Sequence, residues 1–284
     1  MFSYIFEKIK RFTARTPFSP IAKRVYYWYL RVIGKRHSLQ DIETSNEDPL
    51  LHLGTDYGGW TFVEDDQLYG STILSAGLGE DASFDIEFAE KYQSKMIIVD
   101  PTPRAVQHFE DIKRSIGENK TESYSEGGKQ PIAAYELSNI DSSQLSLVRK
   151  ALWKEKTKIK FYKPDNESHV SHSIINWQHD YNNDSEYIKV RANTVFSILE
   201  DYNIDKNGIE IVKLDIEGAE IEVLSQMVDN GLLPRQILVE FDKLHNPSEK
   251  GFKRVDKVHR SLLEEGYELL YTDGNADFLY YNTN

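Results

Sequence analysis

The sequence predicts a doubly wound α/β fold, in which helices cover both faces of a mostly parallel sheet. One observation is residues 71–100, where an apolar run, a glycine pair, a helix-like spacing and a second apolar run ending at Asp100 follow each other. Another is residues 209–228, where an apolar run leads through an acidic, glycine-containing turn into a helix-like spacing. Two short apolar runs on either side of residues 272–275 predict a C-terminal antiparallel hairpin.

Two segments precede the first predicted strand. Residues 1–36 form a basic, aromatic arm with nine Lys/Arg and one Glu, a net charge of +8; because the whole chain carries −12, the remainder carries −20. Two prolines divide the arm into amphipathic helical pieces, which suit a peripheral membrane contact or, equally well, packing on the acidic body or on a second subunit. Residues 37–70 are a polar lead-in, in which Trp60 and Phe62 are expected to pack under the sheet.

The predicted domain, residues 71–284, continues beyond Asp100 with alternating helices and strands. In chain order they are a helix over 105–116, a third strand Ser146–Trp153, a short edge strand Lys158–Tyr162 outside the main parallel order, a helix Asn193–Tyr202, a strand Ile209–Leu214, a helix to Val228, a strand Ile237–Phe241, a helix over 250–265, and the hairpin strands Tyr267–Tyr271 and Phe278–Tyr281. This order brings the carboxyl ends of the parallel strands, with the acids that follow them, to one edge of the sheet.

Composition narrows the class of protein. With 284 residues, of which 39% are hydrophobic, the chain is long enough for one large domain with appendages. It has no cysteine, which excludes disulfides, thiolate metal sites and cysteine nucleophiles and fits a reducing, cytoplasmic compartment. No apolar run reaches the roughly 18 residues of a membrane span, and no signal-peptide pattern is visible. The acidic body argues against nucleic acid as a partner.

The glycine turn after the first strand indicates a nucleoside site. Gly77-Leu78-Gly79-Glu80-Asp81-Ala82 matches the dinucleotide pattern G-x-G-x-x-A, in which glycines let the backbone approach the ligand. Glu80 and Asp81 fall where a pyrophosphate would meet the helix N-terminus, and carboxylates there repel phosphate but tolerate a cationic ligand such as S-adenosylmethionine. Both acids also suit a helix start that binds nothing. Asp100, 23 residues beyond Gly77, is placed to accept hydrogen bonds from a ribose.

The C-terminal hairpin gives a second indication of the class. It adds one antiparallel strand to a parallel sheet, which is characteristic of class I methyltransferases and is not usual in dinucleotide-binding domains. We therefore predict a Rossmann-like class I methyltransferase fold, with a mostly parallel seven-stranded sheet, helices on both faces and an antiparallel C-terminal hairpin. An NAD(P)-dependent oxidoreductase, and a non-catalytic membrane- or partner-docking protein with this fold, are the alternatives.

Several stretches together resemble the FkbM family of S-adenosylmethionine-dependent O-methyltransferases, over roughly residues 70–281. They are Gly77-Leu78-Gly79-Glu80-Asp81, Ser83-Phe84-Asp85, Asp100-Pro101-Thr102-Pro103, His169-Val170-Ser171-His172-Ser173, Leu238-Val239-Glu240-Phe241 and, most specific, the block Val212-Lys213-Leu214-Asp215-Ile216-Glu217-Gly218-Ala219-Glu220. Two positions depart from the family pattern. Ser75 replaces the acid that many methyltransferases carry there, and Asp242 stands where the family often has a histidine, with His245 three residues later.

The resemblance implies transfer of a methyl group to a hydroxyl, and we expect the acceptor to be a saccharide, a glycolipid or a lipid-linked glycan. The predicted cofactor-binding residues are Gly77, Leu78, Gly79, Glu80, Asp100, Pro101, Leu152 and Trp153. The glycine turn would hold the methionine part of S-adenosylmethionine, Asp100 the ribose, and Leu152 with Trp153 the adenine, although Trp153 fits a hydrophobic core equally well.

An alcohol is a weak nucleophile, so methyl transfer to it needs a general base or a metal. The candidate catalytic residues are Asp215, Glu217, Asp242 and His172. Asp215 and Glu217 would alternatively cap a helix, and Asp215 with Asp242 could hold a divalent metal such as Mg²⁺ through oxygen ligands, which leaves the metal open. The candidates for binding the acceptor are His169, His172 and His245. The sequence does not determine the oligomeric state.

Overall fold

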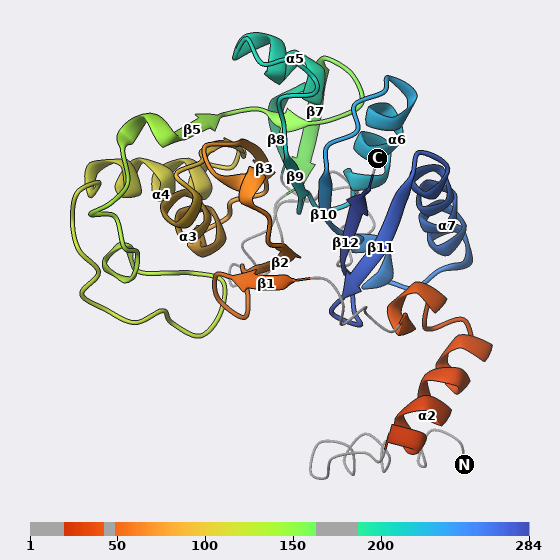
Figure 1. Ribbon diagram of the computed structural model, residues 1–284. Helices are drawn as coiled ribbons and strands as arrows, with labels where there is room; N and C mark the ends of the chain where they lie inside the picture. The colour runs from red at the N-terminus through yellow and green to blue at the C-terminus, as the bar shows by residue number, and fades with distance from the viewer. Residues whose placement is uncertain (1–19, 43–48, 163–186, 284) are drawn as a thin grey trace.

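The structure, a computed structural model, describes residues 20–42, 49–162 and 187–283. Its centre is a seven-stranded sheet in the order β11-β12-β10-β9-β3-β4-β5 (Figure 1). The strands are β3 (Thr72–Ala76), β4 (Lys95–Val99), β5 (Leu145–Val148), β9 (Ile211–Leu214), β10 (Gln236–Glu240), β11 (Tyr267–Thr272) and β12 (Asp277–Asn282). β12 runs antiparallel to β10 and β11, and the other neighbouring pairs are parallel. The predicted fold class is confirmed.

Helices cover both faces of this sheet. One face carries α5 (Val195–Asp201), α6 (Glu220–Asp229) and α7 (Glu249–Glu264), and the other carries α3 (Ser83–Tyr92) and α4 (Pro103–Arg114). The alternation of side chains along a strand divides β4 between the two layers: Met96 and Ile98 pack with α3 and α4, whereas Ile97 and Val99 pack with the other three helices. Because both faces are buried, the strands are almost continuously apolar. The carboxyl edge of the sheet is where the turns that can bind a ligand gather.

The predicted third strand, Ser146–Trp153, was wrong in its extent. The chain turns after β5, where the Lys150 N–H donates to the Val148 carbonyl at 2.8 Å, and the following residues form β6 (Ala151–Leu152) in a different sheet. This second sheet has the order β6-β8-β7, with β7 (Thr157–Tyr162) antiparallel to β8 (Tyr187–Asn193). The edge strand expected outside the main parallel order is therefore β7. β8 was not predicted from the sequence; it begins directly after residues 163–186, which lie outside the described part of the chain.

The lead-in folds onto the face that carries α3 and α4. Its strands β1 (Leu50–Leu53) and β2 (Trp60–Val63) form an antiparallel hairpin, and Trp60 and Phe62 are buried as expected. The side chain of Gln236 joins this hairpin to β10, because it accepts from the Val63 N–H at 2.8 Å and donates to the Val63 carbonyl at 2.9 Å. The loop between β1 and β2 is held at the start of α3, where the Thr55 N–H donates to the Ser83 hydroxyl at 2.9 Å. Short 3₁₀ helices complete the fold: η1 (Ser38–Asp41), η2 (Asp66–Leu68), η3 (Ile132–Ala134), η4 (Ser142–Gln144) and η5 (Asp242–Leu244).

The described part of the basic arm contains one long helix, α2 (Pro20–Val32), which extends away from the body (Figure 1). No helix among the described residues is long and apolar enough to cross a membrane.

Candidate active site

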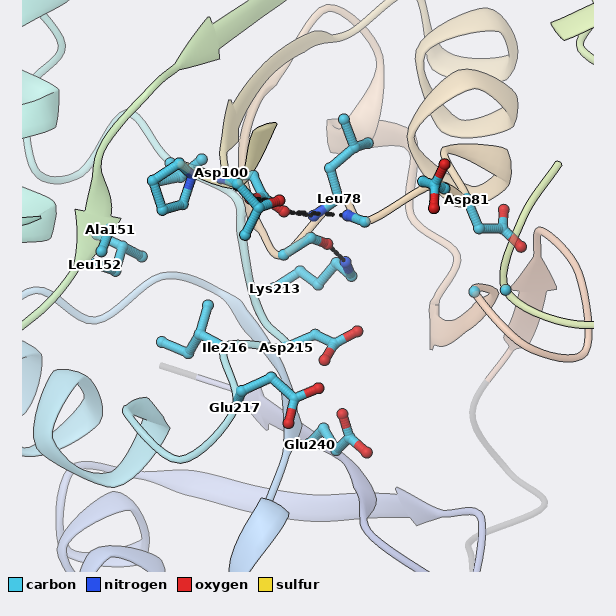
Figure 2. Close-up of a pocket in the computed structure, with 18 of the residues that line it drawn as sticks. Leu78, Asp81, Asp100, Ala151, Leu152, Lys213, Asp215, Ile216, Glu217 and Glu240 are labelled. Atoms are coloured by element: carbon cyan, nitrogen blue, oxygen red, sulfur yellow. Dashed lines mark hydrogen bonds between the residues drawn. The ribbon is translucent and has the colours of Figure 1, made fainter. Parts of the chain in front are cut away.

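A cavity lies at the carboxyl edge of the central sheet, where the turns after β3 and β9 face each other (Figure 2). Its lining residues come from the lead-in loop, the two sheets and both turns: Tyr57, Gly58, Gly77, Leu78, Gly79, Glu80, Asp81, Val99, Asp100, Pro101, Thr102, Gly128, Ala151, Leu152, Phe161, Lys213, Asp215, Ile216, Glu217 and Glu240. All the predicted cofactor-binding residues except Trp153 are among them. Of the predicted catalytic residues, Asp215 and Glu217 line the cavity.

The turn after β3 requires glycine at its first position. Gly77 has φ +87°, a backbone conformation that other residues rarely adopt, and a Cβ built there would lie 1.8 Å from the Asp215 carbonyl oxygen. The two turns therefore touch through backbone at this point. Gly79 also has a positive φ, +58°, but a Cβ there would meet nothing within 4 Å. The open space in front of Gly79 leaves its backbone accessible to a ligand.

Asp100, at the end of β4, holds this turn in place. One carboxylate oxygen accepts from the N–H groups of Leu78 at 3.0 Å and Gly79 at 3.1 Å, and the other accepts from the Thr102 N–H at 2.8 Å and hydroxyl at 2.7 Å (Figure 2). These four bonds occupy the four acceptor positions of a carboxylate. Asp100 lines the cavity at the predicted place, and a ribose hydroxyl would reach it by sharing or replacing one of these donors.

Neither Glu80 nor Asp81 is the N-cap residue of the following helix, although the Asp81 carboxylate accepts from the N–H of its first residue, Ser83, at 2.9 Å. α3 begins at Ser83 after the N-cap residue Ala82, which makes no side-chain capping bond. Glu80 is paired with Lys129 at 3.0 Å and more distantly with Arg104 at 3.7 Å. Carboxyl groups at this position thus line the cavity and, at the same time, fix the loops around it.

The buried Asp81 ties the lead-in loop to the glycine turn. Its carboxylate accepts from the Thr55 hydroxyl at 2.7 Å, the Ser83 N–H at 2.9 Å and the Gln130 amide at 3.1 Å. Since Tyr57 belongs to the same loop and lines the cavity, this network positions one of its walls. No residue of this loop was predicted to belong to the site.

The turn after β9 brings two acids into the cavity without using them as helix caps. α6 begins only at Glu220, and its N-cap residue is Ala219, so the capping alternative for Asp215 and Glu217 is not what the structure contains. Glu217 has φ +50°, a left-handed conformation that is uncommon for a residue other than glycine. Strained backbone of this kind costs about 1–3 kcal/mol and tends to occur at functional sites. It places the Glu217 carboxylate beside that of Asp215 (Figure 2).

Glu240, the last residue of β10, completes an acidic wall. Burial raises the pKa of Glu240 well above the ordinary range, and the charge of the neighbouring Asp215 raises it further. On its other side, the Nε2 atom of the half-exposed His245 lies 2.6 Å from a Glu240 oxygen. Asp277, the first residue of β12, lies opposite Glu240 in the register between β10 and β12. Burial raises the pKa of Asp277 to about 7, and the charges of Asp273 and Asp215 contribute to this rise. At neutral pH a proton is therefore held within this wall.

Lys213 supplies a positive charge behind the acidic wall. Its buried ammonium donates to the Gly77 carbonyl at 2.6 Å and lies 5.6 Å from the centre of the Trp60 ring (Figure 2). The lysine thus joins β9 to the first glycine turn. Lys213 was not predicted as a site residue, although a lysine inside an otherwise apolar strand is a signal in itself, since lysine is rarely buried without a partner.

The structure corrects the position of Asp242. The chain turns into η5 immediately after β10, which carries Asp242 out of the cavity and beside Lys243, whose ammonium is 3.6 Å away. There Asp242 lies close to the fully buried Glu220. Burial is the main reason why the pKa of Glu220 is raised to about 8, and the negative charge of Asp242 is the second. The carboxyl group beside Asp215 is Glu240 instead, so the proposed Asp215–Asp242 metal pair is not formed.

Two further predicted residues, Trp153 and His245, do not line the cavity. Trp153 is partly buried against the small core of the second sheet, which agrees with the core alternative. His169 and His172 lie outside the described residues. His245 reaches the site only through Glu240. In the described part of the chain, no group of three or more His, Asp or Glu side chains could hold a metal ion.

Three features together define a class I methyltransferase fold with a nucleoside-type cavity at its carboxyl edge: the order of the strands, the glycine turn, and the acids at the strand ends. The methyltransferase FkbM domain matches residues 73–269 of the chain. This match spans more than half of the sequence, and the chain therefore belongs to the FkbM methyltransferase family. The family predicted from the motifs is confirmed, and methylation with S-adenosylmethionine is the general activity that family and fold support.

Two solved structures resemble the chain weakly. The SAH-bound methyltransferase PaMTH1 of Podospora anserina is 9% identical, with a TM-score of 0.39 over 75% of this chain and 72% of that one. A protein of Corynebacterium glutamicum is 8% identical, with a TM-score of 0.40 over 99% of this chain and 98% of that one. At scores this low neither structure supports an argument, and the assignment rests on the family match and the strand order. The search of curated proteins gave no match.

Proposed function

We propose that the chain is an S-adenosylmethionine-dependent O-methyltransferase whose acceptor is a hydroxyl group of a saccharide, a glycolipid or a lipid-linked glycan. The observation that carries the proposal is the pair of neighbouring carboxyl groups of Asp215 and Glu240 in the cavity lining, with the His245 ring 2.6 Å from Glu240. An alcohol must lose its proton as the new bond forms, and this arrangement offers a place for that proton. Carboxylates such as Glu217 are also good acceptors for the several hydroxyls of a sugar.

The residues of the cavity fit S-adenosylmethionine. Val99, Leu152 and Phe161 supply an apolar wall of the kind that an adenine needs, and Asp100 stands at the ribose position. The open space in front of Gly79 allows close approach of a ligand, and the surrounding carboxylates favour the cationic sulfonium and ammonium groups. The same carboxylates disfavour the diphosphate of NAD(P), which is the main alternative.

The mechanism follows from the protein's own groups. Bound S-adenosylmethionine supplies an electrophilic methyl group, so the acceptor oxygen gains a carbon and releases a proton. Asp215 accepts this proton, which removes the negative charge that raises the pKa of Glu240, so that the proton held by Glu240 moves to the His245 Nε2. His245 is half exposed and returns the proton to solvent. The turns around Gly77 and Asp100 hold the reacting groups in position, which is the main source of rate enhancement in a direct displacement.

Titration calorimetry of the full chain with S-adenosylmethionine, S-adenosylhomocysteine, NAD⁺ and NADP⁺ tests the cofactor. We expect the first two to bind and the nicotinamide cofactors not to bind. Incubation with methyl-labelled cofactor and a saccharide or glycolipid extract then tests the acceptor, with the label located by mass spectrometry. Binding of NAD⁺ alone would contradict the proposal, as would label found on nitrogen and absent from oxygen.

A further inference from the structure

Helix α2 has one exposed apolar face. Val25, Trp28, Tyr29 and Val32 occupy positions i, i+3, i+4 and i+7, which fall on one side of a helix, and Ile33 extends the same face by one residue. Their exposed fractions are 60%, 59%, 38%, 64% and 40%. A contiguous exposed surface of this kind, carried on a helix that projects from the body, marks an interaction site (Figure 1).

The charged residues of α2 itself are all positive, and the helix contains no acidic residue. Arg24 and Arg31 flank the apolar stripe, where Arg31 also pairs with Asp41 at 3.3 Å. Lys23 lies on the side of the helix that carries Tyr27, 5.4 Å from the centre of that ring. The wider segment 1–36 carries a net +8, whereas the rest of the chain carries −20. Cations beside a stripe containing tryptophan and tyrosine complement a surface of anionic lipid headgroups, where aromatic rings insert at the boundary and cations meet phosphates.

The opposite side of α2 is fixed to the body through Arg36. The Arg36 guanidinium stacks on the Tyr27 ring, 3.8 Å from its centre, and donates to the carbonyl oxygens of Gly274 and Gln40, both at 2.9 Å. The Gln40 amide donates in turn to the Asn275 carbonyl at 2.6 Å. The helix is therefore attached at a defined point, which leaves its apolar face directed away from that attachment.

That attachment lies at the same edge of the sheet as the cavity. Gly274 and Asn275 form the turn between β11 and β12, just before Asp277, which pairs with Glu240 of the acidic wall. Since β11 runs parallel to β10, this turn is at the carboxyl edge, together with Asp215. A surface contacted by α2 would thus lie on the cavity's side of the molecule.

We infer that the apolar face of α2 docks the protein on an anionic lipid membrane, as a peripheral contact that brings the carboxyl edge of the sheet towards the lipid surface. This inference does not depend on the methyl-transfer proposal. If both hold, the acceptor is presented at the membrane, which favours the glycolipid or lipid-linked glycan over a free saccharide.

Flotation of the full chain with vesicles tests the docking. We expect binding to vesicles of phosphatidylcholine with phosphatidylglycerol, weaker binding to phosphatidylcholine alone, and loss of binding as salt concentration rises. The double variant Trp28→Ser/Val32→Ser should bind the anionic vesicles at least about tenfold more weakly, because it removes two large apolar side chains from the stripe. The variant Lys23→Gln/Arg24→Gln should lose most of the difference between the two kinds of vesicle.

The matched control is Tyr69→Ser/Leu263→Ser, which removes two comparably exposed apolar side chains elsewhere, at 61% and 44% exposure, and should bind as the wild type does. All variants change exposed side chains, so their melting temperatures check that folding is intact. Equal vesicle binding by the wild type and the Trp28→Ser/Val32→Ser variant would overturn the inference. So would a chain that ignores vesicles but forms a dimer that the same variant dissociates, since the face would then bind a second copy. No cofactor is present in this assay, so its failure leaves the proposed chemistry untouched.

Discussion

The two turns that form the cavity contain the same kinds of residue but use them in opposite ways. After β3 and β4, the carboxylates are hydrogen-bonded within the protein: Asp100 accepts four hydrogen bonds and Asp81 accepts three. At the ends of β9 and β10 the acids crowd one another, and the pKa values of Glu240 and Asp277 are raised by burial and by neighbouring charges that include Asp215.

This difference separates two tasks. Carboxylates that accept backbone N–H groups are already satisfied, so they hold a binding surface in a fixed shape before the ligand arrives. Carboxyl groups that face each other share protons, so a small change in their surroundings moves a proton. The half built around Gly77 is therefore suited to binding, and the half built around Asp215 is suited to proton transfer.

The largest expected effect is on the acidic half. Asp215→Asn removes the proton acceptor, and kcat should fall about 10²- to 10⁴-fold, the usual range for loss of a general base, while affinity for S-adenosylmethionine changes little. Glu240→Gln should lower kcat less and shift the pH dependence of kcat, because an amide keeps the size of the side chain but cannot pass on a proton. Steady-state kinetics with parallel calorimetry measure both quantities.

Asp242→Asn is the control for this pair, since Asp242 lies two residues beyond Glu240 but outside the cavity. We expect its kcat, normalised to folded protein, to stay near that of the wild type. If kcat fell strongly in Asp242→Asn but stayed normal in Asp215→Asn, the general base would be Asp242 and the comparison between the two halves would be reversed.

In the binding half, substitution of a glycine in the turn should lower the stability of the protein through its effect on the backbone. Gly77→Ala forces a side chain into a left-handed conformation and against the Asp215 carbonyl, and we expect it to lower the free energy of unfolding by about 3 kcal/mol or more. Gly79→Ala shares the unfavourable φ but meets no atom within 4 Å, so it should cost only about 1–2 kcal/mol. Urea denaturation of the two variants without cofactor compares them directly. Equal losses would show that the contact between the two turns has no energetic consequence.

The smallest effect concerns stability against pH. Because the pKa of Asp277 is raised to about 7, the folded chain binds this proton more tightly than the unfolded chain does. Its contribution to stability is fully present below the ordinary aspartate pKa of about 4 and is lost as the pH rises through about 7. The difference in unfolding free energy between Asp277→Asn and the wild type should therefore move by about 1–2 kcal/mol in favour of the variant from pH 4 to pH 8. This expected change of about 1–2 kcal/mol is smaller than the value obtained from about 1.4 kcal/mol for each unit of the pKa shift, because the surroundings of a buried carboxylate rearrange when it becomes charged. A constant difference across this pH range would mean that Asp277 titrates normally.

Much of the fold followed from local patterns. Short apolar runs bounded by glycines and acids located the strands of the central sheet, and the hairpin around residues 272–275 located its antiparallel member, because burial on both faces leaves a clear apolar signature. The exception was Ser146–Trp153, an apolar stretch that crosses from one sheet to another. Its turn at Lys150 has no glycine or proline to mark it, so sequence pattern alone could not divide it.

The site was predicted only where a motif and its chemistry coincide along the chain. The glycine turn, Asp100 and Asp215 are such positions, and all of them line the cavity. Glu240 and Lys213 were not assigned, because what makes them part of the site is their contact with residues far away in sequence: Lys213 with Gly77 and Glu240 with Asp215.

By itself, then, the sequence determined the class of fold, the family and the two turns that face the cavity, because backbone freedom at glycine and the apolar content of a strand are properties of short segments. Only the tertiary structure decided which carboxyl group stands beside which. Asp242 and Glu240 are two residues apart on the chain, yet Glu240 lines the cavity, whereas the turn after β10 places Asp242 close to Glu220 at the start of α6. Proton affinity depends on burial and on the nearest charges, and both of these exist only once the strands have been brought together.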